Sequence, residues 1–210
     1  MRSYLFIHIL FMTLTPLISQ AQSVTDLLAR LREKYTTSAL EVHFREHLST
    51  ASASDTVTYT GVMFLKGNAF RIETPLQVLV TDGSTIWVYH VPDSQVVIDT
   101  YREDLFSFSP DKLIHLPLDI FTITDSTYVH MNHRRLWRIT LRPREPGTLI
   151  DTLILWLDPE GPQLVQAAIK DANGTWMRFE ITRIQLHPDL PDTLFQFSPP
   201  PDVEVVDLRL

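Results

Sequence analysis

The chain has 210 residues, with 18 Lys plus Arg against 25 Asp plus Glu, a formal net charge of −7 and no Cys. This length allows one large domain or two small ones, and the acidic balance argues against nucleic-acid binding and against tight docking on an anionic membrane. Without disulfides, an exported protein of this size must be held together by its hydrophobic core.

The first residues have the pattern of a secretory signal peptide. Arg2 forms a short positive region, and an apolar run follows from Leu5 to Leu14. Ser19-Gln20-Ala21 places small residues at positions −3 and −1 of a cleavage site before Gln22. Residues 1–21 are therefore predicted to be a cleaved leader.

The remaining chain, residues 22–210, is predicted to be a single exported domain with a net charge of −8. It has no run of the roughly 18 apolar residues that a membrane-spanning helix needs. Gln22 stands where a bacterial lipoprotein would carry its lipidated Cys. We therefore expect a soluble monomer in the periplasm that neither spans the membrane nor carries a lipid anchor.

An amphipathic helix is predicted from an N-cap at Ser23 to just before Ser38. Apolar residues recur at helical spacing along one side, and charged residues occupy the other. The apolar positions are Val24, Leu27, Leu28, Leu31 and Tyr35.

From Leu40 to Tyr101 the apolar period is two, which is typical of β-strands. The strongest element is the stretch Leu76–Tyr89, in which Asp82-Gly83 is predicted to form a two-residue hairpin turn. Side chains alternate faces along a strand, and paired residues share a face. One large apolar face is therefore expected to carry Leu76, Val78, Val80, Trp87 and Tyr89, joined by Phe44, Met63, Phe70 and Ile72 from the preceding strands.

This apolar face has two interpretations. It is either ordinary packed core, as in most alternating strands, or the wall of a cavity that a lid or an apolar ligand covers.

The strand pattern is interrupted between Arg102 and Leu118. Ser109-Pro110 indicates the start of a short helix with Pro at its first position, and Pro117 ends it. Because so short a helix is marginal by itself, it is expected to pack on the apolar face of the sheet as a movable lid. Its apolar side chains are Leu105, Phe106, Phe108, Leu113, Ile114 and Leu116.

Strands resume at Tyr128 and continue to the last extended piece, Phe197–Val206, with turns at Asp158–Gly161 and Asn173-Gly174. About ten strands and two helical elements are expected in all. The predicted fold class is mainly β: a single antiparallel sheet curled into an open or partial barrel, with the helical pieces on its inner side.

The chain lacks the common motifs of catalysis and metal binding. No G-x-S-x-G, H-E-x-x-H, P-loop or Cys-based metal pattern occurs. His43 and His47 share a strand face, but the alternation makes that face the outer one. The sequence therefore predicts a protein that is not an enzyme and has no cofactor or metal.

An ordered set of short segments resembles the outer-membrane lipoprotein carrier proteins of the LolA type. It begins with the N-terminal helix and the inward Phe44, and continues with the segments at 61–66, 81–89 and 156–161. Phe195-Gln-Phe-Ser-Pro-Pro200 completes it, so that the resemblance covers nearly the whole chain after the leader.

This resemblance implies an unclosed antiparallel half-barrel with a helical lid over a hydrophobic cavity that binds acyl chains. It also implies a periplasmic shuttle that takes acylated lipoproteins from an inner-membrane ABC-type releasing complex to an outer-membrane acceptor. Better-known members have an Arg-Pro pair after the Lys equivalent to Lys66, and that Arg latches the lid. Gly67 stands there instead, and Arg71 is the nearest replacement.

Two other functions remain open from the residues alone. A sensory domain of the same fold would detect lipoproteins and bind a protein partner, although such sensors usually carry a second domain. An envelope hydrolase would need a nucleophile and base brought together from distant positions, because no local motif supplies them.

Overall fold

The computed structural model describes residues 16–49, 57–102, 118–186 and 189–209. Within these ranges, one α-helix, α1 (Pro16–Thr36), precedes twelve strands, and there are two short 3-10 turns, η1 (Leu118–Ile120) and η2 (Asp192–Phe195). The strands are β1 (Leu40–Ser49), β2 (Val57–Lys66), β3 (Ala69–Glu73), β4 (Gln77–Thr81), β5 (Thr85–His90), β6 (Gln95–Thr100), β7 (Phe121–Met131), β8 (Arg134–Pro143), β9 (Ile150–Asp158), β10 (Gln163–Asp171), β11 (Trp176–Leu186) and β12 (Glu204–Asp207).

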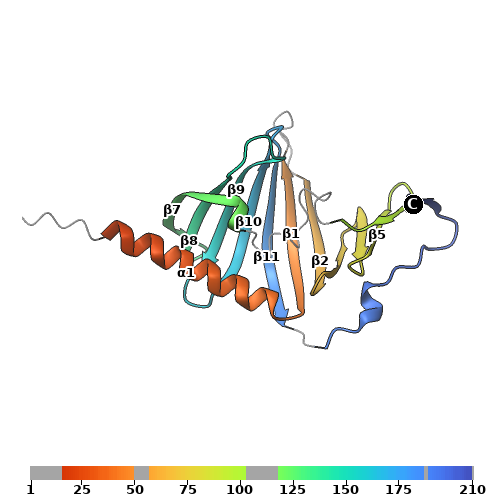
Figure 1. Ribbon diagram of the computed structural model, residues 1–210, viewed down its shortest axis with the longest axis horizontal. Helices are drawn as coiled ribbons and strands as arrows, with labels where there is room; N and C mark the ends of the chain where they lie inside the picture. Colours follow the sequence, from red (N-terminus) through yellow and green to blue (C-terminus); the bar gives the residue numbers. More distant parts are fainter. Residues whose placement is uncertain (1–15, 50–56, 103–117, 187–188, 210) are drawn as a thin grey trace, which may run out of the picture.

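All twelve strands belong to one sheet, in the order β12-β6-β5-β4-β3-β2-β1-β11-β10-β9-β8-β7. The sheet curls without closing, so β12 and β7 are its two edges (Figure 1). Neighbours pair antiparallel except at one edge, where β12 runs parallel to β6. The unclosed, mainly β architecture confirms the prediction from sequence, whereas an all-antiparallel sheet is wrong for this last strand.

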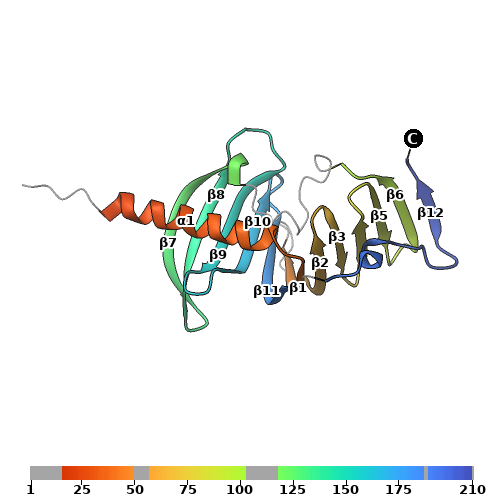
Figure 2. The same cartoon turned by 60° about the horizontal axis from the view of Figure 1, so that its bottom comes forward.

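Helix α1 covers the inner face of the β7–β11 half of the sheet (Figures 1 and 2). Its predicted apolar side is confirmed, since Val24, Leu27, Leu28, Leu31 and Tyr35 are all buried in the main core. The helix starts at Pro16, however, so the N-cap expected at Ser23 is wrong. No helix among the described residues is long and apolar enough to cross a membrane.

The hairpin of β4 and β5 has a longer loop than predicted. Thr81 pairs with Ile86 and Val80 with Trp87, so four residues lie between the last paired positions instead of two. A shift of two positions keeps every side chain on its predicted side of the hairpin, because the side-chain period of a strand is also two. The predicted grouping within the hairpin is therefore confirmed although the turn is not.

The outer face of β2–β6 is covered by the C-terminal arm, defined here as residues 189–203 (Figure 2). Lys66 Nζ donates to the Leu190 carbonyl at 2.7 Å and forms an ion pair with Asp192 at 2.8 Å. Phe195 is buried in a small second core, and the arm then reaches the sheet edge, where Glu204 N–H donates to the Ser94 carbonyl at 2.9 Å. This half of the sheet therefore has apolar contacts on both faces.

Candidate functional site

The inner face of β1–β5 is a continuous apolar surface built by cross-strand rows. One row runs from Val42 through Met63, Ile72 and Leu79 to Val88, with each residue directly paired to the next. A second row runs through Leu40, Leu65, Phe70, Thr81 and Ile86. The hydroxyl of Thr81 donates to the Thr85 carbonyl at 2.7 Å, so the one polar member of these rows is satisfied. This surface is a candidate apolar binding site.

Four of the nine predicted cavity residues belong to this inner surface. Phe44, Met63, Phe70 and Ile72 are 1–3% exposed and lie in the main core with the apolar side of α1. The ring of Tyr101 packs edge-on against Phe70, with ring centroids 5.9 Å apart.

Four of the other five predicted cavity residues lie on the opposite face, and the fifth, Leu76, lies outside the strands. Val80 pairs with Arg71, which neighbours Phe70 in β3 and so points to the other side of the sheet. The same alternation places Val78, Trp87 and Tyr89 on the outer face, and Leu76 is 42% exposed just before β4. The expectation of one face shared by all nine residues is wrong, because both faces of this half are apolar and the C-terminal arm packs on the outer one. The ring of Tyr89, for example, lies 6.1 Å from that of Phe197.

Arg71 lies on the outer face as well. Its guanidinium forms an ion pair with Glu73, two positions along β3, and donates to the Leu194 carbonyl at 3.5 Å. These contacts hold the C-terminal arm and do not face the inner surface. The latch role of Arg71 therefore stays a prediction, because its partner would be the lid. The predicted lid residues 105–116 lie outside the described residues.

The ring of Phe44 lies over the neighbouring position of β2, which has room only for a Gly. Gly61 is its direct partner in β2. A Cβ added to Gly61 would lie 2.8 Å from Phe44 Cε2, closer still to Cζ, and 2.9 Å from the Glu73 carbonyl oxygen. The other side of the Phe44 ring packs edge-on against Phe179, with centroids 6.0 Å apart. The position of this ring is therefore set from both neighbouring strands.

Glu46 places one carboxyl group on the same inner face. It pairs with Tyr59 in β2 and Phe179 in β11, two positions beyond Phe44. Burial among these neighbours raises the pKa of the Glu46 carboxyl above its ordinary value. The sequence analysis missed this residue, although it interrupts the apolar alternation of β1.

A pocket of ≈510 Å³ lies at the rim of the barrel, where β7 begins. It is lined by residues 119–121 and by the β8–β9 loop. Ile120 and Leu149 in its lining are 55% and 61% exposed, whereas Phe121 is part of the main core. The pocket therefore links exposed apolar side chains to the interior. None of its residues was predicted as part of a site; Leu149 follows a Pro/Gly-rich loop and reads as the start of a strand in the sequence.

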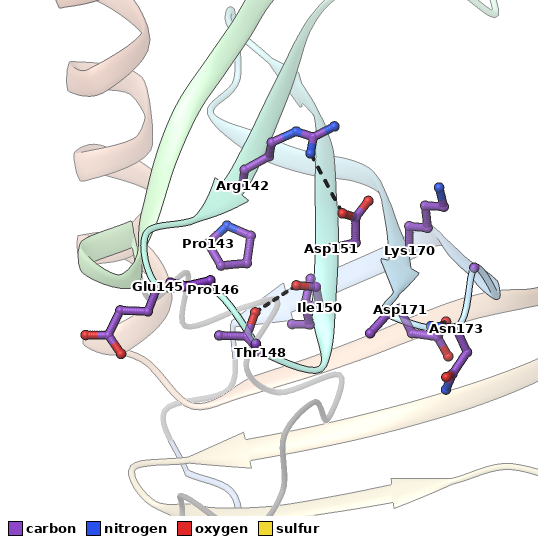
Figure 3. A pocket seen from close by; sticks show the side chains of 13 residues that line it. Arg142, Pro143, Glu145, Pro146, Thr148, Ile150, Asp151, Lys170, Asp171 and Asn173 are labelled. Atoms are coloured by element: carbon purple, nitrogen blue, oxygen red, sulfur yellow. Dashed lines mark hydrogen bonds and ion pairs between the residues drawn. The ribbon is translucent and has the colours of Figure 1, made fainter.

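A second pocket of ≈570 Å³ lies beside it, between the β8–β9 loop and the β10–β11 turn (Figure 3). Its side chains carry both signs of charge, including an ion pair between Arg142 and Asp151 at 3.7 Å. Thr148 closes the loop by donating to the Ile150 carbonyl at 2.8 Å. A polar, mixed-charge surface of this kind is a poor site for an apolar ligand.

The histidines on β1 make ordinary polar contacts. His43 Nε2 lies 2.6 Å from Glu41 Oε1, and His47 Nδ1 lies 2.9 Å from Thr58 Oγ1. Both are on the outer face, as predicted from the alternation. In the described ranges, no group of three or more His, Asp or Glu side chains is arranged to hold a metal ion.

Comparison with known proteins identifies the family. The family model described as "Outer membrane lipoprotein carrier protein LolA" matches residues 35–198. The chain belongs to the LolA family. This membership associates it with lipoprotein binding and transport in general and confirms the resemblance seen in the sequence.

Individual relatives of this LolA-family chain are distant. An outer-membrane lipoprotein carrier protein from Alcanivorax borkumensis is 28% identical over 147 residues, which cover 67% of this chain and 68% of the relative. A protein of the same description from Francisella tularensis subsp. novicida is 21% identical and covers 90% of each chain. The crystal structure of an uncharacterized conserved protein from Thermus thermophilus has a TM-score of 0.56 and 14% identity, covering 89% of this chain and 99% of that one, and so shares the fold.

Proposed function

We propose that this chain is a periplasmic carrier that binds the acyl chains of lipoproteins on the inner face of its open barrel. It would receive acylated lipoproteins from an inner-membrane ABC-type releasing complex and pass them to an outer-membrane acceptor. The observation that carries the proposal is the continuous apolar inner surface, with Phe44, Met63, Phe70 and Ile72 at its centre, in a member of the LolA family.

The physical chemistry of this surface suits such a cargo. Each CH₂ group of an acyl chain that leaves water contributes about 0.8 kcal/mol. The inner surface offers aliphatic and aromatic side chains for that contact, and the relatives are named as carriers and not as enzymes. The predicted lid over residues 105–118 stays a prediction within this proposal.

Two valines allow a matched test of which face binds acyl chains. Val88 on β5 shares the inner face with Leu79, and Val78 on β4 shares the outer face with Tyr89. Both valines are half-buried. We expect Val88→Trp to weaken binding of a fluorescent fatty acid about tenfold, which corresponds to the loss of roughly two CH₂ contacts. Val78→Trp should leave this affinity nearly unchanged.

Both variants are first compared with the parent protein by urea unfolding, so that a loss of binding is not a loss of folding. Equal weakening by the two substitutions, or weakening by Val78→Trp alone, would contradict an inner binding face. Transport itself is tested separately, by mass spectrometry of lipid-linked peptides that co-purify with the protein from the periplasm. Recovery of no acylated peptide would count against the carrier role.

A further inference from the structure

The outer face of the other half of the sheet contains a recess of ≈370 Å³, which we call the Trp slot. It opens across β1, β9, β10 and β11, on the side of the sheet away from α1. Its lining residues are His47, Ser49, Ile154, Trp156, Ala168, Trp176 and Arg178.

The strand register explains how the slot forms. Ala168 pairs with Ile154 on one side and with Arg178 on the other, so a small side chain lies in the middle of this row. Trp156 belongs to the row on one side of it and Trp176 to the row on the other. Two large rings therefore flank a floor only one methyl group high, which leaves a recess wide enough for an inserted side chain.

The surroundings of the slot are strongly cationic in a chain whose net charge is −7. Among the described residues, the three rows that cross it carry two carboxylates: Glu180, which Arg45 engages at 3.1 Å, and Asp125, at the β7 end of the Ala168 row. Arg138 beside Trp156, Lys170 beside Trp176 and Arg178 in the lining have no ion pair with the described residues. Together with Arg45, these three cations outnumber the two carboxylates of the rows, so the slot favours an anionic partner.

The two halves of the outer face differ in how they are covered. On β2–β6, the C-terminal arm packs over the apolar side chains, and Val80 and Val96 are fully buried. Over the Trp slot, Trp176 stays 37% exposed and Arg178 is exposed. Exposed Trp and Arg side chains are the residue types that contribute most to protein–protein interfaces.

We propose that the Trp slot binds an acidic segment of a partner protein, which inserts one aromatic or large aliphatic side chain between Trp156 and Trp176. Carboxylates on either side of the inserted side chain pair with Arg178 and Arg138. A lipid bilayer fits this surface less well, because a flat membrane is met by protruding Trp side chains, whereas these two line a recess. The site lies on the face opposite the inner surface, so it is independent of acyl-chain binding.

The test uses a defined peptide and no lipid. The probe is an amidated peptide, Gly-Asp-Glu-Asp-Phe-Glu-Asp-Gly, titrated into the full chain while NMR follows the indole N–H signals of Trp156 and Trp176. We expect saturable binding that shifts both signals. Replacing the Phe of the peptide with Ser, or its acidic residues with Lys, should weaken binding at least about tenfold, as expected for a single interface anchor.

Two variants test the slot, and one matched variant controls for charge. Ala168→Leu fills the recess, and Arg178→Glu reverses its charge; each should weaken binding at least about tenfold. Arg183→Glu makes the same charge change at an exposed position of the same strand, beside His43, and should change affinity less than about twofold. If Ala168→Leu does not fold, the peptide affinities of Arg178→Glu and Arg183→Glu still show whether the peptide binds at the slot.

Several results would overturn the proposal. These are the absence of saturable peptide binding, equal weakening by Arg178→Glu and Arg183→Glu, and unchanged binding by a folded Ala168→Leu. Binding to vesicles of equal parts phosphatidylethanolamine and phosphatidylglycerol that is lost with Arg178→Glu would assign the slot to a membrane instead. Self-association that is lost with Arg178→Glu would assign it to a second copy of the chain.

Discussion

Replacing Gly61 with Ala tests how tightly the inner surface is packed around Phe44. The added Cβ would lie 2.8 Å from Phe44 Cε2 and 2.9 Å from the Glu73 carbonyl oxygen. The carbonyl belongs to a paired strand and cannot retreat without breaking the ladder, so the Phe44 ring has to move. That ring is 3% exposed and is already held on its other side by Phe179.

The expected size of the effect combines two opposing contributions. Forcing an extra carbon into a packed core costs about 1–3 kcal/mol, and replacing Gly by Ala in a strand returns about 0.5–1 kcal/mol of backbone entropy. We therefore expect Gly61→Ala to lower the free energy of unfolding by about 1–2 kcal/mol. The measurement is urea unfolding followed by far-UV circular dichroism and by Trp fluorescence.

A control and a double mutant make this prediction specific. A Cβ at Gly161 would meet nothing within 4 Å, so Gly161→Ala should change stability by less than about 0.5 kcal/mol. In a Phe44→Leu background, Gly61→Ala should be less harmful, with a coupling energy of about 1 kcal/mol. A Gly61→Ala protein as stable as the parent, with no coupling to position 44, would refute the close approach described above.

The remaining predictions concern two ionisable groups whose pKa is raised by burial. Tyr35→Phe removes the oxygen that accepts the Leu164 N–H at 3.0 Å, and the unpaired donor should lower the free energy of unfolding by about 1–3 kcal/mol at neutral pH. Burial raises the pKa of Tyr35 to about 12, against the lowering effect of the Leu164 hydrogen bond. The pKa of Tyr35 in the folded protein lies above the unfolded value of about 10. The free energy of unfolding should therefore be unaffected by this group below pH 10, and it should fall by about 2–3 kcal/mol between pH 10 and pH 12. Urea titrations across that range that show the same decline in Tyr35→Phe would contradict this. Burial also raises the pKa of Glu46, so its charged form destabilises the fold at neutral pH. Glu46→Gln should therefore be more stable than the parent at pH 7, and the gain should vanish as pH falls below the ordinary Glu value; Glu160→Gln, at an exposed turn, is the matched control.

Local patterns determined most strands, the apolar side of α1 and the relative faces of side chains. The helical spacing of Val24, Leu27, Leu28, Leu31 and Tyr35 was enough to predict which side of α1 is buried, because 3.6 residues per turn place them together. In the hairpin of β4 and β5, the period of two kept Val78 and Val80 on the side of Trp87 and Tyr89, even though the turn was predicted two residues too short. An ordered set of short segments was also enough to place the chain near its family.

Tertiary contacts decided which face of the sheet is the inner one. Alternation separates two faces but does not say which of them turns toward the core, and on β2–β6 both faces are apolar. The choice depends on the C-terminal arm, which reaches the outer face through contacts such as Lys66 with Asp192 and Arg71 with Leu194. These partners are more than a hundred residues apart in the chain, so no local pattern contains them.

The same reason explains the sites that sequence analysis did not find. The Trp slot exists because Trp156, Ala168 and Trp176 come from three different strands that the register brings side by side. By itself, the sequence determined strands, the helix face and the family of this protein, because those depend on residues close together in the chain. The inner surface, the parallel last strand and the slot were decided only when distant strands paired, because pairing selects the register and the covering segments that fix each side chain's neighbours.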